Sequence, residues 1–236
     1  MGGNCFLGAE VCSNATAEQL TKGYKVFAEE AFNVNPNYKP DTVNIDGWDA
    51  TRIAFNTLFV SIVIIRCFLH AFIKIRDCTK KHPKANEIYS KIWKVYHSPN
   101  KRTFSQRLRR LKNWAVENLP NTTALEKIEK TYERSTKYQI AYDHPDCHRT
   151  SNMCDRLMRT MDKSLFVQQM FHGTLASSTE MIRSWAIYQN YYPFCMKKLK
   201  VSGSLYCRAG ELNGFQYSDN WLHNLVVASS MNGYRQ

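Results

Sequence analysis

The chain has 236 residues, of which 44% are hydrophobic, so it can bury a sizeable core and is not a disordered tail. Lysine and arginine outnumber the acids by 32 to 20, and the net charge of +12 favours a polyanionic partner such as nucleic acid. The most apolar run, residues 58–75, is broken by Arg66, His70 and Lys74, which argues against a transmembrane span.

Eight cysteines are scattered through the chain, and the amino terminus lacks the charged start and apolar core of a signal peptide. These features predict reduced thiols in a cytoplasmic protein. In that compartment the glycosylation sequons at Asn14 and Asn121 have no role.

The amino-terminal part of the chain predicts a strand followed by an amphipathic helix. Residues 5–11 form a short apolar run that is typical of a strand. Apolar residues then recur at helical spacing between residues 16 and 32, and Asn14 or Thr16 is in position to cap that helix.

A βαβ unit is predicted next. Residues 42–47 form a β-rich run that carries an acid, Asp46, near its end; a helix follows over residues 48–59, and residues 61–66 are almost continuously apolar. Such a unit pairs two parallel strands that are buried on both faces. Asp46 would then lie at the carboxyl end of its strand, where open α/β sheets carry their chemistry. The alternative is an Asp-Gly turn or a helix N-cap.

Cys67 and His70 follow the second strand of this unit, three positions apart. Such a pair is half of a typical zinc site, but the nearest other ligand types, His144, Cys147 and His148, have no regular ligand spacing. Zinc is therefore the weaker interpretation of the pair.

Residues 80–143 predict a basic helical insertion. Phe104, Leu108 and Leu111 fall on one face of a helix, whereas positive charges without a single acid occupy its other positions. These charges belong to Lys101, Arg102, Arg107, Arg109, Arg110 and Lys112. They either contact nucleic-acid phosphates or form an ordinary solvated helix face.

A further helix is predicted to begin at Thr150 or Ser151, either of which is a suitable N-cap. Apolar residues recur at roughly helical spacing between residues 153 and 166, and Asp155 falls off that stripe. The simplest interpretation of Asp155 is a surface carboxylate that pairs with Arg159 one turn later.

Taken in order, these features resemble the catalytic domain of DDE transposases, in particular the Mutator-type transposases of bacterial insertion sequences. An acid near the end of a strand (Asp46), a Cys-x-x-His that ends at His70, a helical insertion and an Arg-Thr-Ser-Asn-x-x-Asp-Arg helix (residues 149–156) follow one another in the order of that family. Residues 172–175 and 212–225 also resemble the carboxyl-terminal part of such transposases.

The resemblance implies an α/β fold with a ribonuclease-H-like (integrase-like) core that a helical insertion interrupts. Residues 1–79 and 144–192 would form the two parts of the core. Residues 80–143 would form the insertion, and residues 193–236 a tail that packs on the core.

The resemblance also implies metal-dependent cleavage and transfer of DNA strands. Two Mg²⁺ or Mn²⁺ ions, held by carboxylates, activate the attacking oxygen and stabilise the leaving one in such reactions. Asp46 and Asp155 are the implied catalytic metal ligands, and His70 is implied to orient the scissile phosphate. Arg149 and Arg156 would contact phosphates or fix Asp155. The implied partners are transposon ends and target DNA, together with a second copy of the chain or a full-length transposase, and no membrane.

Two departures from the family pattern lower the expected activity. The third acid of the family is a glutamate, whereas Asp155 is one methylene shorter. The first acid of the family lies on a strand that would precede residues 5–11, yet the sequence has no acid before Glu10, and Asp41 is too close to Asp46 to replace it. We therefore expect a chain that lacks the first strand and the amino-terminal DNA-binding domain.

Three hypotheses for the function follow. The first is a transposase-like protein with impaired catalysis, and the second is a non-catalytic protein that binds DNA or a transposase. The third and weakest is a nuclease or zinc protein of another family. DNA binding that survives the loss of Asp46 and Asp155 separates the second hypothesis from the first.

Overall fold

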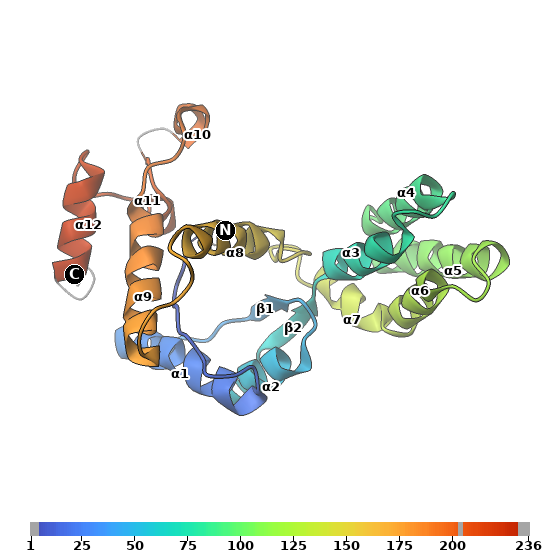
Figure 1. The fold of residues 1–236 in the computed structure, drawn as a ribbon, viewed down its shortest axis with the longest axis horizontal. Coiled ribbons are helices and arrows are strands. Elements are labelled where there is room, and N and C mark those ends of the chain that lie inside the picture. Colours follow the sequence, from blue (N-terminus) through green and yellow to red (C-terminus); the bar gives the residue numbers. More distant parts are fainter. Residues whose placement is uncertain (1–4, 203–204, 231–236) are drawn as a thin grey trace. The chain divides into compact units, whose positions relative to one another are not determined.

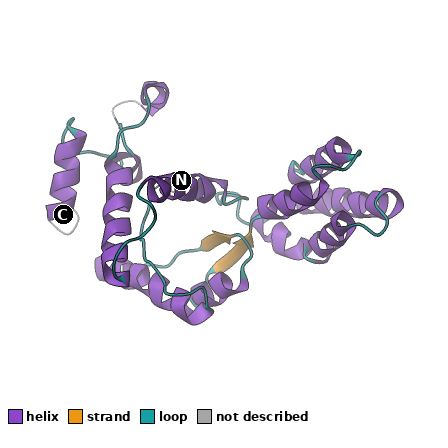
Figure 2. Ribbon diagram, viewed as in Figure 1, coloured by secondary structure: helices purple, strands orange, loops and turns teal. Residues whose placement is uncertain are grey.

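The computed structural model describes residues 5–202 and 205–230, which are mostly helical (Figures 1 and 2). None of the described helices has both the length and the apolar character needed to cross a membrane. The strands are β1 (Thr42–Ile45) and β2 (Val63–Arg66). The helices are α1 (Ala17–Val34), α2 (Asp49–Leu58), α3 (Phe68–Thr79), α4 (Ala85–Tyr96), α5 (Lys101–Asn118), α6 (Thr123–Glu133), α7 (Ser135–Gln139), the 3₁₀ helix η1 (Ile140–Tyr142), α8 (Asn152–Val167), α9 (Leu175–Tyr191), α10 (Met196–Ser202), α11 (Arg208–Asn213) and α12 (Trp221–Ser230).

The predicted ribonuclease-H-like α/β core is wrong. Within the described residues the sheet consists of β1 and β2 alone, and helices make up most of the remainder. Residues 5–11, predicted as a strand, have no regular secondary structure. The side chain of Asn190 accepts a hydrogen bond from the backbone N–H of Phe6 and donates one to its carbonyl oxygen, each at 2.8 Å. These are the backbone groups that a neighbouring strand would need.

The predicted βαβ unit is confirmed. Strands β1 and β2 pair in parallel, with Thr42 opposite Val63 and Ile45 opposite Arg66, and α2 lies between them in the sequence. Burial of the strands on both faces is not observed, because Ile45 is the one buried residue of β1 and Ile65 the one buried residue of β2. In a sheet of two strands each strand is an edge, so most of their side chains stay half-exposed.

The chain forms two compact units. The first, called the bundle unit, consists of residues 39–52 and 59–155. The second unit contains the described residues of the ranges 5–38, 53–58 and 156–230.

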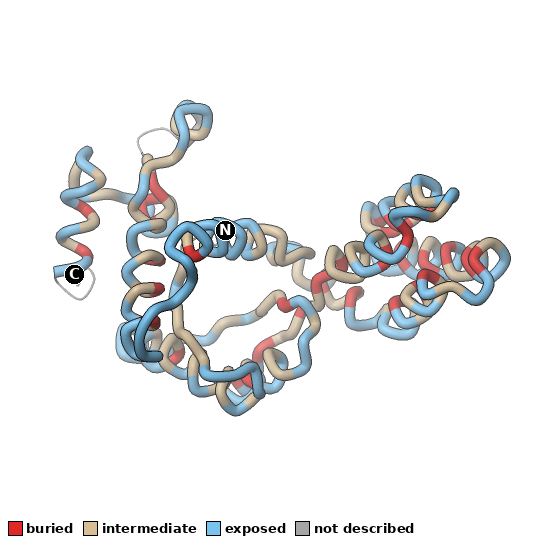
Figure 3. Tube along the Cα trace, viewed as in Figure 1, coloured by how far each residue is buried: buried red, intermediate tan, exposed pale blue. Residues whose placement is uncertain are grey.

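The core of the bundle unit lies between α3, α4, α5, α6 and α7, where Figure 3 shows buried positions at intervals along each helix. The apolar face predicted for α5 is confirmed, because Phe104, Leu108, Leu111 and Ala115 are at most 3% exposed. They pack with Phe68, Ile75, Ile88, Ile92, Val95, Leu119, Ala124, Ile128 and Tyr138. The helical character predicted for residues 80–143 is therefore explained by one continuous apolar core.

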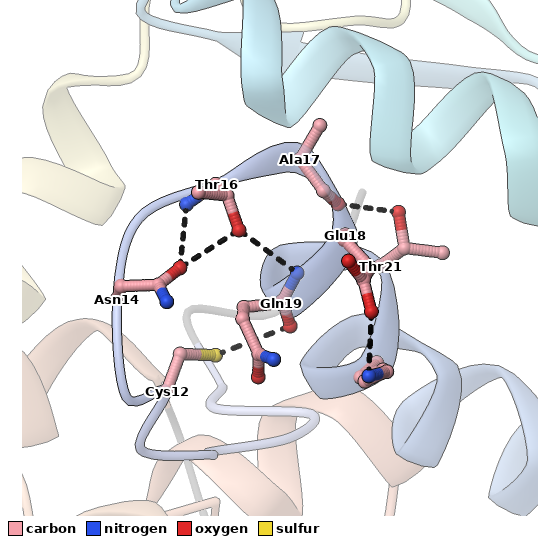
Figure 4. A network of polar contacts seen from close by, with 8 residues as sticks. Cys12, Asn14, Thr16, Ala17, Glu18, Gln19 and Thr21 are labelled. Atoms are coloured by element: carbon pink, nitrogen blue, oxygen red, sulfur yellow. Dashed lines mark hydrogen bonds and ion pairs between the residues drawn. The ribbon is translucent and has the colours of Figure 1, made fainter.

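In the second unit, α9 packs against α11 and α12, and the cap predicted for α1 is confirmed (Figure 4). Thr16 occupies the N-cap position, and its hydroxyl oxygen accepts a hydrogen bond from the backbone N–H of Gln19 at 3.4 Å. Asn14 holds that cap, because its Oδ1 accepts from both the backbone N–H and the hydroxyl of Thr16, at 3.1 and 2.7 Å.

Candidate functional site

The candidate site lies in the bundle unit, around the carboxyl ends of the two parallel strands. Asp46 directly follows β1, and Cys67 directly follows β2. His70 lies in the first turn of α3, and Asp155 lies in the first turn of α8. The chain thus carries the predicted acids and histidine on separate elements.

His70 and Asp155 are brought together by the fold. The Nε2 atom of His70 lies 3.9 Å from Oδ1 of Asp155, and the two side chains are 27% and 41% exposed. Among the ion pairs of the described residues, Asp155 pairs with His70 and not with Arg159. The surface-pair interpretation of Asp155 is therefore wrong.

Ser151 connects the two side chains. Its hydroxyl donates to Oδ2 of Asp155 at 3.4 Å and lies 3.4 Å from Nδ1 of His70. Because the hydroxyl has one proton, its oxygen keeps lone pairs that can accept from the ring nitrogen of His70. One serine thus contacts both functional groups.

The backbone of Ser151 is fixed as well. Its carbonyl oxygen accepts the first hydrogen bond of α8, from the backbone N–H of Asp155 at 2.9 Å, which confirms Ser151 at the N-cap position. Its own N–H donates to the sulfur of Cys67 at 3.2 Å, and Cys67 is only 1% exposed. In the Cys-x-x-His pair, the cysteine therefore anchors the start of α8 while the histidine contacts its acid.

Strand β1 contributes two further polar residues that the sequence interpretation missed. The side-chain amide of Asn44 donates to the carbonyl oxygen of His148 at 2.6 Å, and the hydroxyl of Thr42 donates to the sulfur of Cys147 at 3.3 Å. The Oδ1 atom of Asn44 is buried and accepts no hydrogen bond from the described residues. Alternation along the strand was the available signal, because every second side chain points to the same face as Asp46.

A tight turn holds Asp46 in place. Its Oδ1 accepts a hydrogen bond from the backbone N–H of Trp48 at 2.8 Å, as the turn interpretation predicted. Gly47 has a φ of 92°, and its carbonyl oxygen accepts from the guanidinium of Arg66 at 3.1 Å. A Cβ atom at Gly47 would lie 2.4 Å from Nε of Arg66, so this position needs glycine.

The thiol of Cys154 lies in the field of both acids. Burial raises its pKa, and the negative charges of Asp155 and Asp46 raise that pKa further.

The side chains present do not fit the two-ion centre that the resemblance implies. Mg²⁺ and Mn²⁺ require several hard oxygen ligands, and a pair of ions requires carboxylates that converge between them. Over residues 5–202 and 205–230, no three or more His, Cys, Asp or Glu side chains are grouped closely enough to hold a metal ion. The same finding gives no support to a zinc site around Cys67 and His70.

Arg149, predicted to contact DNA, is half-buried and bonded to other residues of the bundle unit. Its guanidinium stacks over the rings of Tyr142 and Tyr96, with 4.3 and 5.4 Å to the ring centroids. It also donates to the hydroxyl of Tyr142 at 2.6 Å and to the carbonyl oxygen of Ser98 at 3.4 Å. Arg149 therefore ties the segment before α8 to the turn before α5. Arg156, in the second unit, is exposed.

Of the six positive charges predicted on α5, Lys101 pairs with Asp143, with 2.5 Å between Nζ and Oδ2, and the other five fall into two groups. Arg107 donates to the carbonyl oxygens of Lys94 and His97 at the end of α4, at 2.7 and 3.2 Å, and Lys112 lies 4.8 Å from the ring centroid of Tyr132. These two side chains have internal roles. The other group, Arg102, Arg109 and Arg110, is exposed.

Comparison of the chain with protein-family models, with curated proteins and with solved structures finds no match.

Proposed function

We propose that this chain is a DNA-binding protein of the transposase type that does not cut or join DNA by itself. The observation that supports the proposal is the convergence of His70 and Asp155, from α3 and α8, beside the end of β1 that leads to Asp46. His70 and Asp155 lie far apart in the sequence, and bringing such a histidine and an acid together is one requirement of a site for phosphodiester chemistry.

The chemistry of the side chains supports binding more strongly than cleavage. A ring N–H of His70 can donate a hydrogen bond to a phosphate oxygen, and the net charge of +12 attracts a polyanion. Cleavage by the transposase route needs carboxylates that hold two metal ions, and the described residues do not form such a group. We therefore expect binding without efficient strand cleavage.

The test is an assay of DNA binding and DNA nicking on the same protein sample. The full chain is incubated with supercoiled plasmid and with a labelled duplex, in buffers that contain Mg²⁺, Mn²⁺ or a chelator. The expected result is salt-dependent binding with no nicking above that of an Asp46→Ala/Asp155→Ala control, which lacks both candidate acids. Absence of binding at low salt would overturn the proposed function. Strong Mn²⁺-dependent nicking that Asp46→Ala abolishes would instead show that the chain completes a catalytic centre.

A further inference from the structure

Helix α5 presents polar side chains on the side opposite its buried face. Phe104, Leu108, Leu111 and Ala115 turn into the core, and at 3.6 residues per turn the opposite side carries positions 102, 106, 109 and 113 with position 110 beside them. These residues, Arg102, Gln106, Arg109, Arg110 and Asn113, are all exposed and are called the outer face of α5.

The outer face is held in one orientation. The four core side chains of α5 are at most 3% exposed, which fixes the rotation of the helix about its own axis. Arg107 bonds the carbonyl oxygens at the end of α4, and Asn100 caps the start of α5 by accepting from the N–H of Thr103 at 2.9 Å. A rigid helix loses little conformational freedom when its outer side chains bind a partner.

Over the first three turns of α5 the outer face carries charge of one sign, whereas Glu117, which is exposed, lies on the same side in the last turn. The three arginines of the outer face form no hydrogen bond or ion pair with the described residues, and α5 contains no acid before Glu117. Gln106 and Asn113 add side-chain amides that can donate to phosphate oxygens or to base edges. Arg102 and Arg109 are about 10 Å apart along the helix axis, a length over which one DNA strand carries about three phosphates.

We propose that the outer face of α5 is the surface through which this protein contacts double-stranded DNA. That DNA is the partner rests on the proposed function, but the residues of this surface lie outside the candidate site. Duplex DNA fits better than duplex RNA, because the major groove of B-form DNA admits an α-helix whereas that of A-form RNA is too narrow.

The turn before α5 is joined by hydrogen bonds to the segment that leads to the candidate site. Ser98, in the turn before α5, accepts hydrogen bonds at its carbonyl oxygen from Arg149 and from the hydroxyl of Tyr142. Arg149 lies in the segment that leads to Ser151 and α8. DNA that contacts the start of α5 would therefore lie near that segment.

The test compares two triple variants of the full chain by fluorescence anisotropy with a labelled duplex, over about 50 to 200 mM salt. The first variant is Arg102→Gln/Arg109→Gln/Arg110→Gln. The second is Lys130→Gln/Arg134→Gln/Lys137→Gln, which removes the same charge from exposed positions in α6, in α7 and at the residue between them. Thermal unfolding of both variants checks that the fold is retained, and an RNA duplex of the same sequence serves as the second probe.

The α5 variant is expected to bind DNA at least tenfold more weakly at about 100 mM salt, with a slope of log K against log salt that is shallower by about 2.7. The α6–α7 variant should change the slope by less than about 1. Equal losses in the two variants would overturn the inference while leaving the proposed function intact. Tighter binding of wild type to the RNA duplex would overturn the choice of DNA, and absence of wild-type binding to either duplex would overturn both proposals.

Discussion

The Nε2 atom of His70 lies 3.9 Å from Oδ1 of Asp155, and Ser151, which is 81 positions from His70 in the sequence, lies within 3.4 Å of both side chains. The same serine begins α8 and bonds the sulfur of Cys67. Ser151 therefore fixes the start of α8, Asp155 and His70 relative to one another.

Replacement of Ser151 by alanine tests this arrangement. Ser151→Ala loses the hydroxyl between His70 and Asp155, and we expect the free energy of unfolding to fall by about 1 kcal/mol. Ser151→Thr keeps the hydroxyl and should lose less. Urea unfolding followed by tryptophan fluorescence measures both variants, and an alanine variant as stable as wild type would show that the hydroxyl contributes nothing.

Gly47→Ala should destabilise the turn that holds Asp46 by about 2 to 3 kcal/mol, because alanine is strained at positive φ and its Cβ would meet the bound guanidinium of Arg66. Gly214→Ala is the matched control. Gly214 also has a positive φ, of 77°, but a Cβ atom added there would meet nothing within 4 Å, so only the backbone cost of about 1 kcal/mol is expected. An equal fall in the free energy of unfolding of the two variants would show that the Arg66 guanidinium does not add to the cost at Gly47.

Arg149→Lys separates an internal role from a DNA-binding role. Lysine keeps the positive charge but cannot reproduce the planar stacking between Tyr96 and Tyr142. We expect a loss of about 1 to 2 kcal/mol in the free energy of unfolding, with the salt dependence of DNA binding unchanged. An unchanged stability together with a shallower salt slope would mean that Arg149 contacts phosphate instead.

The stability of the second unit should depend on pH through Cys5. Burial raises the pKa of this thiol from 9.0 to about 11. The thiol therefore ionises at lower pH in the unfolded chain than in the folded one. Its contribution to the free energy of unfolding is complete below pH 9 and is lost as pH rises through about 11. Cys5→Ser should reduce the alkaline loss of stability by on the order of 1 kcal/mol, since solvent screens a half-buried group. Parallel curves of stability against pH for the two proteins would contradict this.

Local structure could be predicted where one physical pattern dominates. The apolar residues of α5 recur at helical spacing, and Phe104, Leu108, Leu111 and Ala115 are all buried. Residues 5–11 form an equally clear apolar run, yet the backbone N–H and carbonyl oxygen of Phe6 are hydrogen-bonded to the side chain of Asn190 and not to a neighbouring strand. Nothing near Phe6 in the sequence indicates that distant partner, and so the strand prediction fails.

The fold brings together His70 and Asp155, two of the three residues that the sequence order singled out, but the residues that support them could not be predicted. Asp46, His70 and Asp155 follow from their order along the chain. Ser151 bridges His70 and Asp155, and the buried Oδ1 of Asn44 accepts no hydrogen bond from the described residues. Both features depend on contacts between segments that are distant in the sequence. Arg149 could not be assigned, because a charge pattern does not reveal whether an arginine faces solvent or lies between two tyrosines.

The central claim, that DNA passes over the site where His70 meets Asp155, is tested most directly by neutralising Asp155 together with Asp46, the acid that follows β1. The measurement is the affinity of Asp46→Asn/Asp155→Asn for duplex DNA in chelator, relative to Glu129→Gln/Glu133→Gln, which removes two negative charges from α6. Carboxylates beside a phosphate repel it by up to about 1 kcal/mol each in water, so the site variant should bind about fivefold more tightly than the control variant. Equal affinities, or weaker binding by the site variant, would contradict the claim.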